Sequence, residues 1–123
     1  MSTEDNKALV QRHIETFNAR DLDAYFSCFA ASFAHHHTPA VAPDLEGMRQ
    51  LVTHLLTTNP DFHITLEEMT AEGDRVVARV SQQTSLPFPG AAEALYYYRI
   101  VNGKIVELST FEDTQKVVAS MMR

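Results

Sequence analysis

The sequence predicts an α+β domain in which helices come first and long antiparallel strands follow. Three observations carry this prediction. Apolar residues in the first half recur with the 3.6-residue period of amphipathic helices. From Phe62 onward they alternate with polar residues, which is the period of a half-buried strand. Near the C-terminus, β-rich runs at 96–101 and 104–108 flank Asn102-Gly103, a pair that favours a type I′ hairpin turn.

Three helices are expected in the first half. The first covers residues from about 4 to 18, with a cap at Ser2 or Thr3. Asp21 caps a second, short helix that runs to about Phe29, and a third helix ends before Asn59-Pro60. The apolar stripes that define the first and third helices are Val10, His13, Ile14 and Phe17, and Met48, Leu51, Val52 and Leu55.

The remaining segments are expected to form a sheet. Residues 33–37 form a short extended segment between the second and third helices. Residues 62–66 and 75–85 form two strands joined by a turn at 72–74. The tyrosine-rich hairpin follows, and a tail helix from 113 to about 122 completes the chain. A curved sheet with helices on one face would enclose a pocket.

The hairpin carries apolar residues on both faces. If the alternation continues without interruption, Tyr96 and Tyr98 share a face with Phe111, and Tyr97 shares the other face with Leu108. The sequence does not show which face lines a pocket. Because one pocket cannot use this much apolar surface, we expect a homodimer that packs through the sheet.

Composition limits the classes of function. The 123 residues suit one domain, and the net charge of −6 disfavours nucleic acid and anionic membranes as partners. No apolar run reaches the length of a bilayer span, and the polar, acidic N-terminus has no signal-peptide character. The single cysteine, Cys28, suits a reducing compartment, so we expect a cytoplasmic protein. We interpret Cys28 itself as buried and inert.

Four segments resemble one family in order and spacing. They are FNARDLD at 17–23, NPD at 59–61, AEGDRVVAR at 71–79, and R followed by NGKIVE at 99–107, with Asp113 beyond. Together they resemble the SnoaL-like polyketide cyclases of the nuclear transport factor 2-like superfamily. The resemblance implies one domain over 1–123 with a cone-shaped, curved antiparallel sheet packed against N-terminal helices. It also implies a deep apolar cavity and a dimer, but a fold alone does not determine function.

The resemblance makes Asp113 the candidate catalytic acid/base, since the family's cyclases use an acidic residue near the end of the last strands for an aldol ring closure. Burial in an apolar cavity would raise the pKa of its carboxyl group toward a useful value. The alternative is that Asp113 only caps the tail helix. Two family features are missing. The family often has a His-Trp pair two residues after GKI, where this sequence has Leu108-Ser109. The family also often has a histidine in the loop that corresponds to residues 84–90, and this loop has none.

The triplet His35-His36-His37 is the second candidate for chemistry. On a strand, His35 and His37 share one face and His36 takes the other. The family often has a histidine here followed shortly by proline. Both His36 and His37 can be aligned to it, and Thr38-Pro39 favours His37. His37 is therefore the second candidate catalytic residue, and His37 or Tyr98 would polarise a substrate carbonyl.

The expected ligand is a small apolar molecule that carries a carbonyl group. Any reaction would be cofactor-independent acid/base chemistry, such as cyclisation, isomerisation or hydration; the alternative is a non-catalytic ligand-binding or dimerisation module. We expect no metal, because the histidine spacing gives no set of ligands, and no nucleotide cofactor, because no phosphate-binding motif is present. His13 is expected as a hydrogen-bonded core histidine. The expected ligand-binding residues are Tyr25, His35, His54, Tyr96, Tyr98 and Phe111.

Overall fold

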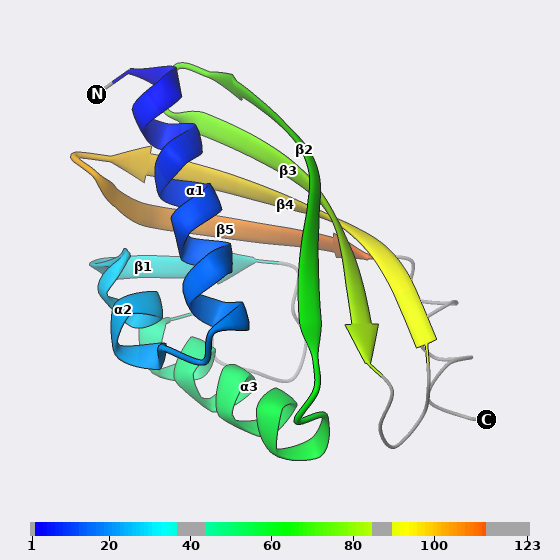
Figure 1. Ribbon diagram of the computed structural model, residues 1–123. Helices are drawn as coiled ribbons and strands as arrows, with labels where there is room; N and C mark the ends of the chain where they lie inside the picture. Colours follow the sequence, from blue (N-terminus) through cyan, green and yellow to red (C-terminus); the bar gives the residue numbers. More distant parts are fainter. Residues whose placement is uncertain (1, 37–43, 85–89, 113–123) are drawn as a thin grey trace.

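The computed structural model describes residues 2–36, 44–84 and 90–112, drawn as coloured ribbons in Figure 1. Within these ranges the helices and strands follow the expected order, helices first. They are α1 (Thr3–Asn18), α2 (Leu22–Ser27), β1 (Phe29–His36), α3 (Leu45–Thr58), β2 (His63–Glu72), β3 (Arg75–Thr84), β4 (Gly90–Val101) and β5 (Lys104–Glu112). The expected tail helix from residue 113 lies outside the described residues. None of the described helices is both long and apolar enough to cross a membrane.

The helix starts follow from local sequence. Ser2 caps α1 by accepting a hydrogen bond from the Asp5 amide, and the Asp5 carboxylate accepts one from the Ser2 amide in return. Asp21 caps α2 and Asp44 caps α3 through the same kind of bond to a backbone amide. The expected apolar stripe of α1 is confirmed, because all four of its residues are buried.

The five strands form one curved sheet in the order β1-β5-β4-β3-β2. The pairs from β2 to β5 are antiparallel as expected, but β1 lies parallel to β5. The expectation of a wholly antiparallel sheet was therefore wrong at this edge. No hairpin turn joins β1 to β5, so local sequence does not encode their relative direction. The sheet does not close into a barrel, since β1 and β2 are both edge strands.

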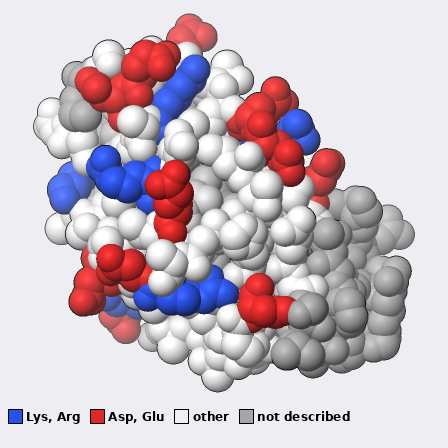
Figure 2. Space-filling model, in the orientation of Figure 1, with Lys and Arg blue, Asp and Glu red and all other residues white. Residues whose placement is uncertain are grey.

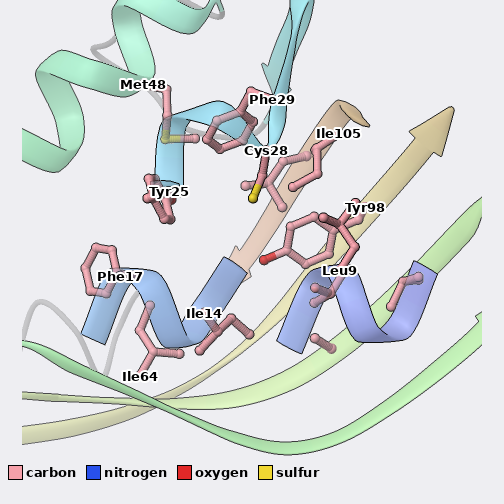
Figure 3. Packing of buried hydrophobic residues seen from close by; sticks show 14 of the residues in the cluster. Leu9, Ile14, Phe17, Tyr25, Cys28, Phe29, Met48, Ile64, Tyr98 and Ile105 are labelled. Atoms are coloured by element: carbon pink, nitrogen blue, oxygen red, sulfur yellow. The ribbon is translucent and has the colours of Figure 1, made fainter. Parts of the chain in front are cut away.

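The helices cover the concave face of the sheet (Figure 1). α1 crosses this face and packs on β2 and β3, while α3 packs on β1 and α2 contacts both α1 and β1. Figure 3 shows the buried cluster between these layers, with side chains from α1, α3 and the sheet directed toward one another. Val76, Ala78 and Val80, at alternate positions of β3, are fully buried in this core. The hydrophobic core therefore lies between the helices and the inner face of the sheet.

A β-bulge in β5 interrupts the expected alternation of the hairpin. Ile100 pairs with Ile105, whereas the preceding residue on β4, Arg99, pairs with Glu107. Val106 is therefore an extra residue on β5 with no partner of its own in the ladder. Every β5 residue after it moves to the face opposite the one that uninterrupted alternation predicts.

This shift changes the surroundings of two predicted residues. Leu108 is buried on the inner face and pairs with Tyr98, although the sequence placed these two residues on opposite faces. Phe111 pairs with Leu95 and is exposed, so it does not share the face of Tyr98. The expected face assignment was wrong for residues 107–111, because a bulge is set by the register of two strands and leaves little trace in one of them.

Asn18 fastens the edge strand β2 to the end of α1. Its Nδ2 donates to the Ile64 carbonyl at 2.7 Å, and the Ile64 amide donates to its Oδ1 at 2.9 Å. Arg20 extends the connection by donating to the carbonyl of Pro60 at 2.9 Å. The segments FNARDLD and NPD therefore meet in the structure, and both have a structural role.

We expect Asn18→Ala to lower the free energy of unfolding by about 1–3 kcal/mol, because it removes both partners of the Ile64 backbone groups. Urea denaturation followed by circular dichroism measures this change. Thr70→Ala, at an exposed position of the same strand, is the control and is expected to change stability by less than about 0.5 kcal/mol. Equal effects of the two substitutions would contradict a fastening role for Asn18.

Candidate functional site

Two polar pairs lie side by side on the inner face of the sheet. His35 Nε2 on β1 lies 3.2 Å from Thr110 Oγ1 on β5. Gln82 Nε2 on β3 donates to the Tyr96 hydroxyl on β4 at 2.6 Å. Thr110 and Tyr96 are cross-strand partners, which makes the two pairs neighbours. We call His35, Thr110, Tyr96 and Gln82 the inner polar row.

His35 is held in the interior by the pleat of β1. Its side chain is 5% exposed, whereas His36 points outward and lies 3.5 Å from the Glu107 carboxylate. Burial lowers the pKa of His35 to about 4, and the neighbouring His36 adds to the shift. The His35 imidazole is therefore neutral near pH 7, and a neutral imidazole offers one donor and one acceptor nitrogen. Such a group can hydrogen-bond an uncharged oxygen without becoming charged.

Tyr98 and Tyr25 lie deeper than the inner polar row. The Tyr98 ring is perpendicular to the Tyr96 ring, with 6.3 Å between the centroids, and Figure 3 shows its hydroxyl directed toward the middle of the buried cluster. Burial raises the pKa of both Tyr98 and Tyr25 well above the usual value near 10. Both phenols therefore keep their protons and can act only as neutral groups at physiological pH.

Two predicted ligand-binding residues lie elsewhere. His54 is exposed on α3, because it lies two positions from the buried Val52 and so on the opposite side of the helix. There it borders a shallow, open depression of about 430 Å³. Phe111 is 47% exposed on the outer face of the sheet, as the bulge in β5 requires. The structure thus brings Tyr25, His35, Tyr96 and Tyr98 into the interior, but not His54 or Phe111.

The predicted catalytic residues, His37 and Asp113, lie outside the described residues. The strands that lead to them are parallel neighbours, with His36 opposite Ser109. Of the inner polar row, His35 and Thr110 lie close to the described ends of these two strands. Within the described ranges, no group of three or more His, Cys, Asp or Glu residues could hold a metal ion.

Thr110 and Gln82 were missed by sequence reasoning. The period of two that runs through Val76, Ala78 and Val80 reaches Gln82, and this was a signal for its inward position. The bulge at Val106 hid the inward position of Thr110. Neither hydrogen bond could be read from the sequence, because each joins residues from different strands.

The face of the molecule shown in Figure 2 carries mixed charge. On the face shown in Figure 2, basic side chains are interspersed with acidic ones and do not gather into one patch. On the outer face of the sheet, Arg99 bridges Asp74 at 2.9 Å and Glu107 at 3.1 Å. This pattern differs from the basic stripe that nucleic-acid-binding surfaces present.

Residues 10–108 match the family model of the SnoaL-like domain, which covers most of the chain. The chain belongs to the SnoaL-like domain family. No protein with a curated description matches the sequence.

Solved structures support a nuclear transport factor 2-like fold for this SnoaL-like domain. IdmH, a proposed polyketide cyclase from Streptomyces antibioticus, is 21% identical with a TM-score of 0.82, over 94% of this chain and 97% of its own. A proposed polyketide cyclase from Bacillus cereus is 18% identical with a TM-score of 0.86, over 98% of this chain and 85% of its own. A nuclear transport factor 2-like protein of unknown function from Burkholderia pseudomallei is 17% identical with a TM-score of 0.85, over the full length of both chains. At these identities the similarity establishes the fold alone.

Proposed function

We propose that this SnoaL-like domain, as a single unit over residues 1–123, binds a small, neutral, mainly apolar molecule that carries a carbonyl oxygen. The inner polar row is the observation that supports this proposal, because a few convergent polar groups in apolar surroundings are typical of small-molecule sites. Among the described residues, the buried polar side chains are Asn6, His13 and His35, none of which is an acid, a lysine or an arginine. A charged ligand would find no opposite charge among them.

The proposed chemistry is cofactor-independent acid/base catalysis, of the cyclisation or isomerisation type. Asp113 would remove a proton from the carbon next to the carbonyl group, and His37 would donate to the developing enolate oxygen. The neutral His35 imidazole and the Tyr96 and Tyr98 phenols, which lie in the interior, suit the same donor role. The similarity to proposed polyketide cyclases such as IdmH agrees with this reaction class.

The alternative is a non-catalytic module that binds a ligand or dimerises, and the outer face of the sheet favours dimerisation. Leu95 is 43% exposed and its cross-strand partner Phe111 is 47% exposed, with the half-buried Tyr97 nearby. Contiguous exposed apolar side chains of this kind usually mark an interface. We therefore propose a homodimer that packs through this face, and we place the protein in the cytoplasm because of its single cysteine.

We expect Leu95→Arg to convert the dimer to a monomer at micromolar concentration, because a charged guanidinium in place of the exposed Leu95 would have to lose its water when the face is buried. Light scattering coupled to size-exclusion chromatography measures the mass. Thr70→Arg, at an exposed position of β2, is the control and is expected to leave the dimer intact. A wild-type protein that is monomeric at this concentration would contradict the proposal.

We expect Tyr96→Phe to weaken binding of 1-tetralone, a neutral bicyclic ketone used as a probe, by about tenfold, because a phenol that accepts from Gln82 can donate its own proton to a ketone oxygen. Ligand-observed NMR titration measures the affinity. Tyr97→Phe removes a hydroxyl from the outer face, where Arg75 donates to it at 3.0 Å, and is the matched control. If 1-tetralone binds both variants and the wild type equally well, the inner polar row does not hold the carbonyl group.

A further inference from the structure

His13 is a buried titratable residue that the proposed acid/base chemistry does not use. It comes from the middle of α1 and is 1% exposed. Its burial was expected, but its Nδ1 atom has no hydrogen-bond partner among the residues that the structure describes. Buried polar atoms in proteins are almost always hydrogen-bonded, so this nitrogen calls for a partner of another kind.

Aromatic rings surround the His13 imidazole. It stacks on Tyr25 with 4.1 Å between the ring centroids, and it meets Phe29 edge-on at 5.0 Å and Tyr98 edge-on at 6.2 Å. Burial lowers the pKa of His13 to about 3, although a hydrogen bond to the Tyr25 backbone opposes the shift. The imidazole is therefore neutral at physiological pH, and a partner for Nδ1 must be uncharged to share such surroundings.

One series of ring contacts connects His13 to the inner polar row through β4. The His13 ring meets Tyr98 edge-on, and Tyr98 meets Tyr96 in the same way at 6.3 Å. Tyr96 belongs to the inner polar row. The Tyr98 ring alone therefore separates the His13 ring from Tyr96, which is one member of the inner polar row.

A second series makes the same connection through β1. Phe29 contacts Phe33 at 4.4 Å, and Phe33 lies nearly parallel to His35 at 6.3 Å. Leu108 lies between the two series, because it pairs with His35 on one side and with Tyr98 on the other. Both series of apolar contacts thus run between two separate polar ends, His13 at the deep end and the inner polar row at the other.

We propose that His13 is a ligand-binding residue whose Nδ1 hydrogen-bonds a second, uncharged oxygen of the ligand, at the end remote from the inner polar row. This inference rests on the proposed function and narrows its ligand class. The ligand is a flat, neutral molecule with an oxygen at both ends of an apolar body, such as a hydroxyketone of two or more fused rings. A ligand with one oxygen would leave either His13 or the row without its contact.

The test compares two probes that differ by one hydroxyl group, 1-tetralone and 6-hydroxy-1-tetralone. We expect the wild type to bind the hydroxyketone about tenfold more tightly, and we expect His13→Phe, which keeps an aromatic ring, to abolish this preference. His63→Phe, at an exposed position of β2, is the control and should keep the preference. NMR titration measures the affinity of the wild type, His13→Phe and His63→Phe for each of the two probes.

A second measurement keeps the test valid if His13→Phe does not fold. In the wild type with 15N-labelled histidine, 6-hydroxy-1-tetralone should shift the His13 Nδ1 resonance, and 1-tetralone should leave it in place. If both probes bind equally and the His13 resonance does not move, an ordered water pairs with Nδ1 or the nitrogen stays without a partner, and the inference is wrong while the proposed function stands. If neither probe binds at millimolar concentration, both the inference and the proposed function are wrong.

Discussion

Replacement of Asp113 by Asn is expected to lower catalysed proton exchange by about a hundredfold or more, because an amide cannot accept the proton that a carboxylate removes. A direct assay is available that needs no knowledge of the natural substrate. In heavy water, a base that removes a proton from the carbon next to the 1-tetralone carbonyl returns a deuteron from solvent. NMR measures the loss of the proton signal, and the rate above the buffer background is the activity.

The same variant separates catalysis from helix capping. Asn caps a helix about as well as Asp, so a purely structural Asp113 would tolerate the change with a small shift in melting temperature. We therefore expect Asp113→Asn to keep its melting temperature within a few degrees and to keep binding 1-tetralone. A folded variant with the full exchange rate would remove Asp113 from the mechanism, and His37 and His35 would be the next residues to replace.

Stability is expected to fall steeply as the pH drops from about 6.5 toward 4. The pKa of His13 is lowered to about 3 and that of His35 to about 4, whereas both groups titrate near 6.5 in the unfolded chain. Above pH 6.5 both histidines are neutral in both states, and stability does not depend on them. Below pH 6.5 the unfolded chain takes up two protons that the folded protein excludes. Each further drop of one pH unit therefore lowers the free energy of unfolding by about 1.4 kcal/mol per histidine.

Over two units of pH this loss is on the order of 5 kcal/mol, which is comparable with the whole stability of a small domain. Urea denaturation at pH 7.0, 6.0 and 5.0 measures the slope. His13→Phe and His35→Phe should each remove about half of it, and His63→Phe, at an exposed position, should leave it unchanged. A slope that survives both interior substitutions would show that neither histidine is buried in its neutral form.

The features that the sequence predicted correctly are those with a local cause. The α1 stripe repeats every turn, and Asn102-Gly103 favours its own turn with both residues at positive φ, 53° and 74°. Asp21 marks a helix start through a bond to the amide of Ala24, three residues away. In each case the residues that form the contact are near neighbours in the chain.

The features that the sequence did not predict depend on residues far apart in the chain. The parallel pairing of β1 joins segments about 70 residues apart, and the bulge at Val106 depends on the register between β4 and β5. The inner polar row needs both, because the bulge turns Thr110 inward and the pairing of β1 brings His35 beside it. The candidate tyrosines and His35 could be named from the sequence, but their grouping could not.

The most direct test of the central claim is a search for intermolecular nuclear Overhauser effects between 1-tetralone and the protein. The claim is that the interior between α1 and the sheet holds a neutral carbonyl compound against the inner polar row. We predict contacts from the probe to the Leu108 methyl groups and to the ring protons of His35 and Tyr96, which share this inner face. Contacts confined to Leu95 and Phe111 on the outer face, or no contact at millimolar probe, would contradict the claim.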